Sequence, residues 1–372
     1  MRATTTPPQN KKLKSMRCIM GAHASPADEV RSQHDESAFS FFSEAKPLSV
    51  TVEDHDRSGY NIEKAEKKIA IILGYYNGEA YVDEQLESIF SQSHSALHVF
   101  IGDDHSPSPF DADVLKIEFK KRLKLSVETR SENVGFAKNF LQSLACIDDS
   151  FEYFAFSDQD DIWYPNKLKK AIEELTKAPA HLPALYCART EIADADCSQI
   201  LGCSPIFNKP PSFANALVQN IGGGNTMVFN KAARDLIVAA SRNTTVVSHD
   251  WWCYQIVTGA GGYVFYDSEP CLKYRQHSNN LVGANTSWSA RLLRIRALME
   301  GRFRAWNDVN LKALADHKHL LTDQNIRILN DFIGARQSSL FKRLKLVKHS
   351  GIYRQTLFGN LGLLFGLLLN RI

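Results

Sequence analysis

The sequence lacks the glycine-rich motifs that mark many nucleotide-binding folds. Neither G-x-G-x-x-G nor G-x-x-x-x-G-K-[ST] follows any of its strand-like apolar runs, which argues against a dinucleotide-binding fold and a P-loop phosphate binder. A strong excess of either charge is also missing, because the net charge is +3 over 372 residues. We therefore expect no nucleic acid as the main partner.

Cysteine is sparse and scattered. The seven cysteines are Cys18, Cys146, Cys187, Cys197, Cys203, Cys253 and Cys271. Their number is odd, and they form neither a C-x-x-C pair nor a zinc-like spacing. This pattern favours a reducing, cytoplasmic environment.

A long apolar run is also missing from the N-terminal region. Near the N-terminus, basic residues precede an apolar stretch of only five residues, 18–22, whereas a secretory signal needs ~7–15. We therefore expect no signal peptide. Residues 1–66 mix Thr, Pro, Ser and charged residues, and we predict a largely disordered extension.

The chain as a whole, with 44% hydrophobic residues, has the composition of a globular protein. The continuous apolar run 69–73 predicts a strand buried on both faces. Residues 81–92 have apolar side chains at helical spacing. Residues 97–101 predict a second strand, and the pattern then repeats. Strands that alternate with helices predict an α/β fold with a mostly parallel sheet.

Polar residues follow these predicted strands. A third strand near 125–127 precedes Asn133, and a fourth near 154–156 precedes an acidic loop. The carboxyl ends of parallel strands lie at one edge of a sheet, where ligands bind. We therefore expect the loops that hold Tyr76, Asp104, Asn133 and the acidic residues to converge.

The acidic loop places Asp158, Asp160 and Asp161 within four positions. Carboxylates this close repel and raise one another's pKa unless a cation or a hydrogen-bond donor compensates them. One interpretation is a metal site. The alternative is a solvated loop, or an aspartate that caps a helix beginning near Pro165.

Together with motifs in the second half, these residues resemble the family-2 glycosyltransferases, which are inverting nucleotide-sugar enzymes with the GT-A fold. The resemblance covers residues 68–283. It further extends to the bacterial rhamnosyltransferases. The motifs that carry it are Tyr75-Tyr76-Asn77-Gly78-Glu79, Gly102-Asp103-Asp104-His105-Ser106, Asn133-Val134-Gly135, Ser157-Asp158-Gln159-Asp160-Asp161, His249-Asp250-Trp251-Trp252 and Tyr274-Arg275-Gln276-His277-Ser278-Asn279-Asn280.

The resemblance implies that Asp103 or Asp104 accepts a hydrogen bond from the ring N–H of thymine or uracil, as a carboxylate can. The alternative is a solvated turn. His105 stands where the family commonly has glycine, which leaves the turn geometry open. The residues placed with the nucleotide are Tyr76, Asn77, Glu79 and Asn133.

The resemblance also implies that Asp158 faces the ribose and that Asp160 binds a divalent cation, Mg²⁺ or Mn²⁺. Such ions keep waters and use substrate phosphates, so one protein carboxylate is sufficient. Lys138 is a candidate for the nucleotide or its phosphates, and the alternative is an exposed helix lysine.

The run from Gly222 to Gly224 enters an apolar strand. Glycines allow the backbone to approach a ligand closely or to adopt positive φ, although a flexible linker is the alternative. By resemblance, Gly223 and Gly224 border the donor sugar and the acceptor.

A helix is predicted to begin at Ser248, which could cap it. An aspartate in its first turn fits the helix dipole, but by resemblance Asp250 is the general base. Trp251 and Trp252 would form an apolar wall on which sugars stack, or they belong to the core.

The predicted strand 271–275 delivers His277. A lone histidine is more often a satisfied polar residue, but the resemblance implies that His277 completes the metal or diphosphate site. Arg275 would be a second phosphate contact.

The C-terminal region is predicted to be helical beyond Ser287, including residues 291–299. Near its end, basic residues precede the apolar run 357–369. As a helix this run measures roughly 20 Å, too short for the ~30 Å hydrocarbon layer. It predicts an interfacial anchor on an anionic cytoplasmic leaflet, or a helix that packs on the domain or on a dimer partner.

We therefore predict an extension at 1–66, a GT-A domain at 67–286 and a helical region at 287–372. The hypothesis is metal-dependent, inverting transfer of L-rhamnose from a dTDP donor to a lipid-linked glycan of a bacterial surface polysaccharide, at the cytoplasmic face of the inner membrane. The alternatives are a UDP-sugar donor, an inactive GT-A module that binds nucleotide sugar or glycan, and a glycoside hydrolase, which also needs two carboxylates.

Overall fold

The structure is a computed structural model that describes residues 66–112, 124–277 and 300–372. All described residues belong to one compact unit of the chain. Residues 1–65 of the predicted extension lie outside the described residues. So do Ser278-Asn279-Asn280, the predicted helix at 291–299 and the predicted domain boundary at 287.

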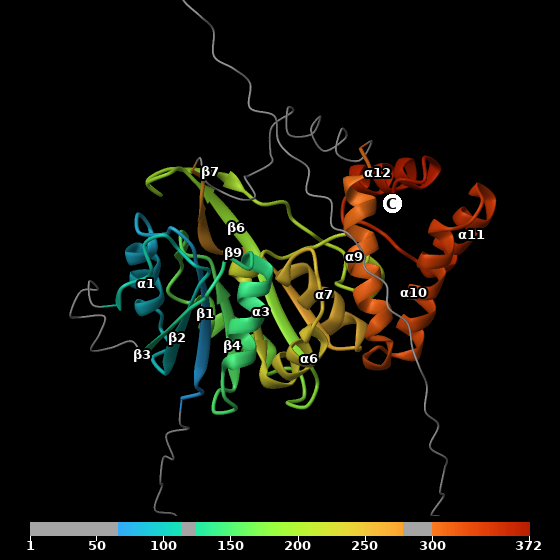
Figure 1. The fold of residues 1–372 in the computed structure, drawn as a ribbon. Helices are drawn as coiled ribbons and strands as arrows, with labels where there is room; N and C mark the ends of the chain where they lie inside the picture. The colour runs from blue at the N-terminus through green and yellow to red at the C-terminus, as the bar shows by residue number, and fades with distance from the viewer. Residues whose placement is uncertain (1–65, 113–123, 278–299) are drawn as a thin grey trace, which may run out of the picture. The chain divides into compact units, whose positions relative to one another are not determined.

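The described residues build one nine-stranded sheet (Figure 1) with the order β3-β2-β1-β4-β8-β6-β9-β5, and β7 pairs with β6. The pairs among β1, β2, β3 and β4 are parallel, as is β6 with β9, whereas β8 runs antiparallel between β4 and β6. The strands are β1 (Ile69–Tyr75), β2 (Leu97–Asp103), β3 (Lys124–Thr129), β4 (Tyr153–Ser157), β5 (Ile162–Trp163), β6 (Ala184–Ala193), β7 (Ile200–Cys203), β8 (Val228–Asn230) and β9 (Tyr263–Arg275). This arrangement confirms the predicted α/β class with a mostly parallel sheet.

Helices cover both faces of the sheet, which explains why β1 and β4 are uninterrupted apolar runs. Along β1, Ile69 and Ile71 pack with α1 and α4, whereas Ala70 and Ile72 pack with α3, α6 and α7. The helices before β9 are α1 (Val82–Phe90), α3 (Phe136–Cys146), α4 (Lys167–Leu175), α5 (Phe213–Ala216), the 3₁₀ turn η2 (Gly224–Thr226), α6 (Lys231–Ser241) and α7 (His249–Gly259).

The carboxyl ends of the first parallel strands lie side by side. Tyr75 at the end of β1 is paired with Asp103 at the end of β2, and Leu73 is paired with Ser157 at the end of β4. The loops that follow these three strands therefore leave the sheet at the same edge, as predicted.

Among the described residues, four helices follow β9 and pack on the sheet domain: α9 (Arg302–Asp316), α10 (Asp323–Arg336), α11 (Leu340–Ser350) and α12 (Leu357–Leu368), with the 3₁₀ turn η3 (Lys318–Leu320). Leu314 and Leu321 share a core cluster with α5 and α7. The amide of Thr322 donates to the Gly259 carbonyl at 3.0 Å. Within the described ranges, no helix combines the length and apolar character needed to span a bilayer.

Candidate active site

The acidic loop after β4 is built into the protein. Asp161 is buried, and its carboxylate accepts hydrogen bonds from Asn225 Nδ2 at 2.5 Å and from the Arg275 amide at 3.4 Å. Helix α4 begins only at Lys167, and its N-cap residue, Asn166, makes no side-chain cap bond. The alternatives of a solvated loop and of an aspartate cap for that helix are therefore wrong.

Burial and mutual repulsion dominate the electrostatics of this loop. Burial raises the pKa of Asp161 to about 7, and the neighbouring Asp160 carboxylate adds to the shift. Burial also raises the pKa of Asp158, and the charges of Asp161, Asp160 and Asp250 raise it further. Asp250 belongs to α7, far from Asp158 in the sequence. Its effect on the pKa of Asp158 indicates that the two carboxylates lie within electrostatic reach of one another.

A buried lysine compensates part of this negative charge. Lys167 Nζ donates to the Asn225 carbonyl at 2.6 Å and lies 3.1 Å from the centroid of the Trp163 ring. Burial lowers the pKa of Lys167 to about 7, against the attraction of Asp161 and Asp158. The sequence reasoning missed this residue. The only sequence feature that could have indicated its burial is the helical spacing of positions 167, 171 and 175, which share the buried face of α4.

Asp160 and His277 meet although 117 residues separate them in the chain. Asp160 Oδ2 lies 2.9 Å from His277 Nε2, and both side chains are mostly buried. The Tyr81 ring stacks on the imidazole with the ring centroids 4.6 Å apart. The two predicted metal ligands are therefore neighbours.

The donor set of this pair fits a divalent cation. Two adjacent ligands of an octahedral ion at about 2.1 Å are roughly 3 Å apart, which matches the observed separation. Among the described residues, no group of three or more His, Cys, Asp and Glu side chains could hold a metal. Mg²⁺ and Mn²⁺ would therefore complete their shells with water and substrate oxygens.

The predicted phosphate contact of Arg275 is wrong. This side chain is only 2% exposed. Its Nε donates to the Asp160 carbonyl at 2.8 Å and its Nη1 to the Ala195 carbonyl at 2.7 Å, while Nη2 forms an ion pair with Glu84. All of these guanidinium partners are protein groups, and one of them is the backbone of Asp160. Arg275 is also the last residue of β9, two residues before His277. Arg275 is therefore a positioning residue.

Asp103 and Asp104 are both buried after β2, with different partners. Asp103 accepts from the amides of Ser106 and Phe110, each at 2.9 Å. Asp104 accepts from the amides of Val134 and Gly135 at 2.7 and 2.9 Å. Asp103 thus shapes its own loop, whereas Asp104 ties that loop to the start of α3. A solvated turn does not describe either residue.

The turn that follows Asp104 adopts a backbone geometry that glycine favours. His105 has φ +62° and so occupies the left-handed region. His105 therefore adopts a backbone conformation that glycine also favours.

The loop after β1 is clamped to the acidic loop. The Gln159 side chain accepts from the Tyr76 amide at 2.8 Å and donates to its carbonyl at 3.0 Å. A Cβ on Gly78 would lie 2.4 Å from Gln159 Oε1, so this position requires glycine. Asn77 has φ +51° and donates its amide to Ser106 Oγ at 3.1 Å. The sequence reasoning missed Gln159, whose role depends on a contact 83 residues away.

The other predicted nucleotide residues lie at the same edge. Asn133 Nδ2 donates to the Asp104 carbonyl at 3.0 Å. Glu79 is exposed after the β1 loop, and Lys138 is exposed on α3. Lys138 lines a surface hollow of about 420 Å³ together with Thr129, Arg130, Glu132 and Val134.

The glycine run is part of the structured site and not a linker. A Cβ on Gly222 would lie 2.4 Å from the Cys187 Cβ, and one on Gly224 would lie 2.2 Å from His249 Nε2. These two glycines therefore permit a close approach to protein atoms. Gly223 between them is exposed, so its backbone is the part that faces outward.

Asp250 lies in the first turn of α7 and is partly exposed. Its Oδ1 accepts from the Trp251 amide at 2.7 Å. Ser248 is the N-cap residue, but its side chain makes no cap bond. The helix therefore begins after Ser248 as predicted, but the first-turn N–H is accepted by the Asp250 carboxylate and not by the serine hydroxyl.

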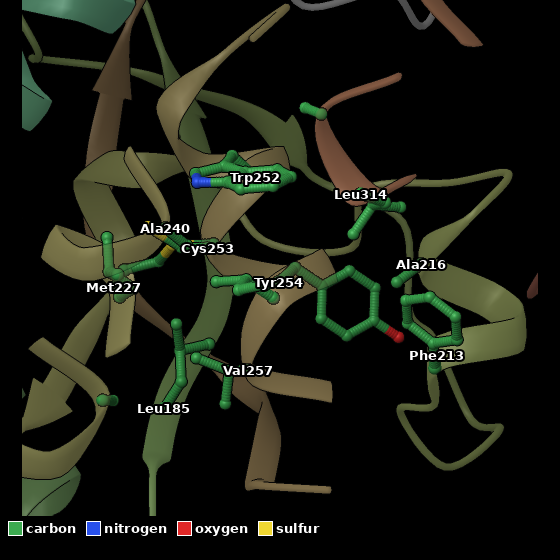
Figure 2. Packing of buried hydrophobic residues seen from close by; sticks show 14 of the residues in the cluster. Leu185, Phe213, Ala216, Met227, Ala240, Trp252, Cys253, Tyr254, Val257 and Leu314 are labelled. Atoms are coloured by element: carbon green, nitrogen blue, oxygen red, sulfur yellow. The ribbon is translucent and has the colours of Figure 1, made fainter. Parts of the chain in front are cut away.

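The predicted sugar-stacking wall of Trp251 and Trp252 is wrong. Trp252 is 0% and Trp251 6% exposed. Trp252 packs in the core beside Ala240, Cys253 and Leu314 (Figure 2). Trp251 Nε1 donates to the Ala216 carbonyl at 2.7 Å. Their indole faces are covered because α7 is packed between the sheet and the C-terminal helices.

His249 is also buried beside the predicted base. Its ring stacks on Phe140 with the centroids 4.1 Å apart. Within the described part of the chain, neither ring nitrogen has a hydrogen-bond partner. Burial lowers the pKa of His249 to about 4, so the imidazole is neutral near pH 7.

The chain is similar to known glycosyltransferases. Residues 70–234 match the glycosyl transferase family 2. The dTDP-rhamnosyl transferase RfbG of Shigella flexneri is 27% identical over 303 residues, which cover 76% of this chain and 96% of that protein. The UDP-Glc:alpha-D-GlcNAc-diphosphoundecaprenol beta-1,3-glucosyltransferase WfgD of Escherichia coli is 28% identical over 109 residues, 29% of this chain and 41% of WfgD.

A solved structure with a similar course is that of S. aureus TarS residues 1–349 in complex with UDP-GlcNAc. It has 15% sequence identity and a TM-score of 0.44, and the match covers 77% of this chain and 93% of that one. From the family match, residues 70–234 are a family 2 glycosyltransferase domain, in a chain that is similar to a rhamnosyltransferase.

Proposed function

We propose that this chain transfers L-rhamnose from dTDP-L-rhamnose to a lipid-linked glycan during the synthesis of a bacterial surface polysaccharide. The similarity to a dTDP-rhamnosyl transferase supports this donor, because it spans 96% of that relative and extends well beyond the family 2 region. A hexose from a UDP-sugar is the second candidate, supported by the similarity to a protein named for UDP-Glc.

The observation that carries the proposal is that Asp250 lies within electrostatic reach of Asp158 in the acidic loop. The charge of Asp250 raises the pKa of Asp158, so a partly exposed carboxylate from α7 lies within electrostatic reach of the loop that would hold the diphosphate. An inverting transfer requires a base on the face of the sugar opposite the leaving group. Asp250 is our candidate for that base.

In the proposed reaction, the acceptor hydroxyl gives its proton to the Asp250 carboxylate while its oxygen bonds to the anomeric carbon. The bond from that carbon to the diphosphate oxygen breaks, and its electron pair leaves with the nucleotide. Asp160 and His277 would hold Mg²⁺ or Mn²⁺, which would neutralise the negative charge of the leaving diphosphate. Arg275 holds the Asp160 backbone in position.

For the nucleotide, we propose Asp104 over Asp103 as the carboxylate that accepts from the base. Asp104 retains slight exposure, whereas Asp103 is fully buried. Each carboxylate oxygen has a second lone pair beyond the backbone bond it accepts. Tyr76 is 45% exposed beside this loop, and its ring could stack on a base. Asp158 would face the ribose, and the candidates that complete the donor site are Asn77, Glu79, Asn133, Lys138, Gly223 and Gly224.

We place the reaction at the cytoplasmic face of the inner membrane, where a lipid-linked acceptor and a nucleotide sugar can meet. The presence of Asp160 and Asp250 favours catalysis over an inactive binding module. A glycoside hydrolase would need no nucleotide site.

A donor panel tests the proposal. The protein is incubated with dTDP-, UDP- and GDP-sugars and Mg²⁺ or Mn²⁺, and nucleotide release is followed with a lipid-linked acceptor. We expect the fastest release from dTDP-L-rhamnose. Faster release from a UDP-hexose would favour the second candidate. Donor binding without release would indicate an inactive module, and glycan cleavage without nucleotide would indicate a hydrolase.

A further inference from the structure

Helix α12 carries apolar side chains on the face that points away from the protein. Phe358 is 82% and Leu357 74% exposed. The other exposed large apolar residues of this segment are Leu361, Leu364, Phe365, Leu368 and Leu369. They recur at intervals of three and four residues and so share one helix face. The opposite face buries Leu363, Gly366 and Leu367. Below, the exposed set from Leu357 to Leu369 is called the outer face.

This helix is held firmly on the protein. Arg343 Nη1 donates to the Leu367 carbonyl at 2.7 Å, Arg304 Nη1 to the Asn370 carbonyl at 2.6 Å and Arg336 Nε to the Ile372 carbonyl at 2.7 Å. At the other end, the Thr356 hydroxyl accepts from the Gly359 amide at 3.0 Å. Both helix ends are therefore satisfied, and the outer face cannot turn inward without breaking these bonds.

The segment that carries the outer face has charges of one sign. Residues 340–372 contain six Lys and Arg residues and no Asp or Glu. Lys342, Lys345 and Lys348 are exposed on α11, and Arg371 is exposed after α12. An apolar surface among basic residues is complementary to the headgroups and acyl boundary of an anionic bilayer. A partner protein would more often present carboxylates, or a mixed-charge rim, to such a surface.

The dimensions of α12 favour contact with one leaflet. Its twelve residues span about 18 Å, less than the ~30 Å hydrocarbon layer. In the view of Figure 1, α12 lies at the upper end of the C-terminal helices.

The segment that precedes α12 is bonded to the acceptor side of the proposed site. The Gln355 amide donates to Gln219 Oε1 at 2.8 Å, just before the glycine run. Asn215 Nδ2 in α5 donates to the Tyr353 carbonyl at 2.9 Å. The neighbouring Ala216 carbonyl accepts from Trp251, the residue after Asp250. The segment before α12 is therefore linked to the proposed base through α5 and Trp251.

We propose that the outer face of α12, with the lysines of α11, docks flat on an anionic lipid bilayer. In this orientation, α5 and the glycine run are held close to the membrane surface. The purpose of the docking rests on the proposed function, because a lipid-linked acceptor carries its sugars at that surface. The docking itself requires no turnover.

Vesicle cosedimentation tests the docking with the full-length chain. Binding to phosphatidylcholine vesicles is compared with binding to vesicles that also contain phosphatidylglycerol. We expect preference for the anionic vesicles, on the order of tenfold, and its weakening by salt. The variant F358S/L361S/F365S should bind on the order of tenfold less. A matched control, I200S/L201S/I206S, removes exposed apolar side chains on and after β7 and should bind like the parent.

A second variant, K342Q/K345Q/K348Q, should lose the preference for phosphatidylglycerol. Failure of the parent to bind anionic vesicles, or equal binding by the α12 variant and the parent, would overturn the proposal. Sedimentation of the parent as a dimer that the α12 variant converts to a monomer would also overturn it, because the outer face would then be an interface between copies.

An assay of nucleotide release in the presence of a soluble acceptor tests the proposed function separately from membrane docking. The α12 variant should retain that activity, since its substitutions touch no residue of the site. If the parent binds vesicles but releases no nucleotide from any donor, the docking stands and the proposed function fails.

Discussion

Asp250 offers the most direct residue-scale test of the reaction. Its Oδ1 accepts from the Trp251 amide, and the amide oxygen of Asn could accept that bond without providing a base. We therefore expect Asp250→Asn to bind the donor like the parent while the transfer rate falls by about 10²–10⁴-fold. Calorimetry with the nucleotide and a rate assay on the same variant measure both quantities. A near-parental rate, or joint loss of binding and rate, would contradict the assignment.

Asp160 tests the metal site at the same scale. Because Asp160 and His277 are the only protein ligands we propose, Asp160→Ala should abolish metal-dependent donor binding and turnover. The exposed α1 residue Glu87 supplies a control, and Glu87→Ala should behave like the parent. Donor binding is measured with Mn²⁺ and with excess EDTA. Full activity in EDTA would refute the role of a cation.

His249 predicts a pH dependence of stability. The unfolded imidazole takes up a proton below its ordinary pKa of 6.5, but the folded one does so only near 4. The unfolded state thus binds more protons in this window, so stability falls as the pH drops from 6.5 to 4. The contribution lost is about 3 kcal/mol.

Replacing this histidine should remove that dependence. In His249→Phe no buried ring nitrogen lacks a partner, so we expect a gain of about 1–3 kcal/mol at neutral pH and a flatter acid limb. Denaturant unfolding of parent and variant across this pH window provides the measurement. If the free energy of unfolding falls equally steeply with pH in parent and variant, other groups control the pH dependence.

At the scale of single elements, the glycine run shows how close packing determines sequence. A Cβ on Gly224 would meet His249 Nε2 at 2.2 Å, whereas one on Gly362 in α12 meets nothing within 4 Å. Gly224→Ala should therefore destabilise the fold by about 1–3 kcal/mol. Gly362→Ala should stabilise it by about 0.5–1 kcal/mol, because alanine favours a helix interior. Chemical denaturation compares them, and equal effects would argue against the close approach.

At the sheet edge, residue type alone does not determine whether a side chain is exposed to solvent. Arg275 follows a strand and carries a positive charge, which is typical of a phosphate contact. The structure instead buries it against carbonyls of Asp160 and Ala195. Trp251 and Trp252 are buried for a similar reason, since both faces of α7 are covered. Residue type and motif position identified these residues, but only packing determined whether they reach solvent.

For the whole molecule, the C-terminal helices belong to the same compact unit as the sheet. Removal of residues 357–372 would delete the buried side chains of Leu363, Leu367 and Ile372 and would remove one carbonyl acceptor each from Arg336 and Arg343. Each buried aliphatic residue is worth about 2–5 kcal/mol. We therefore expect this truncation to destabilise the whole unit and not only to release it from membranes. Thermal unfolding that matches the full-length chain would contradict this expectation.

The sequence alone determined the class of the fold and the edge at which chemistry gathers. Continuous apolar runs at residues 69–73 and 154–156 can be buried on both faces only in a covered parallel sheet, and the polar residues after them must then lie at one edge. The resemblance to the family-2 glycosyltransferases implied that Asp160 binds a cation and that His277 completes the metal or diphosphate site, and these two side chains lie 2.9 Å apart.

Only the tertiary structure decided what each side chain does at that edge. The bonds of Gln159 and Lys167 join positions 83 and 58 residues apart, and such distances leave no local pattern in the sequence. The same holds for α12, whose apolar run permits a buried or an exposed helix. Its outer face is exposed because arginines from α9, α10 and α11 hold the opposite side against the protein, a choice made by long-range contacts and not by local propensity.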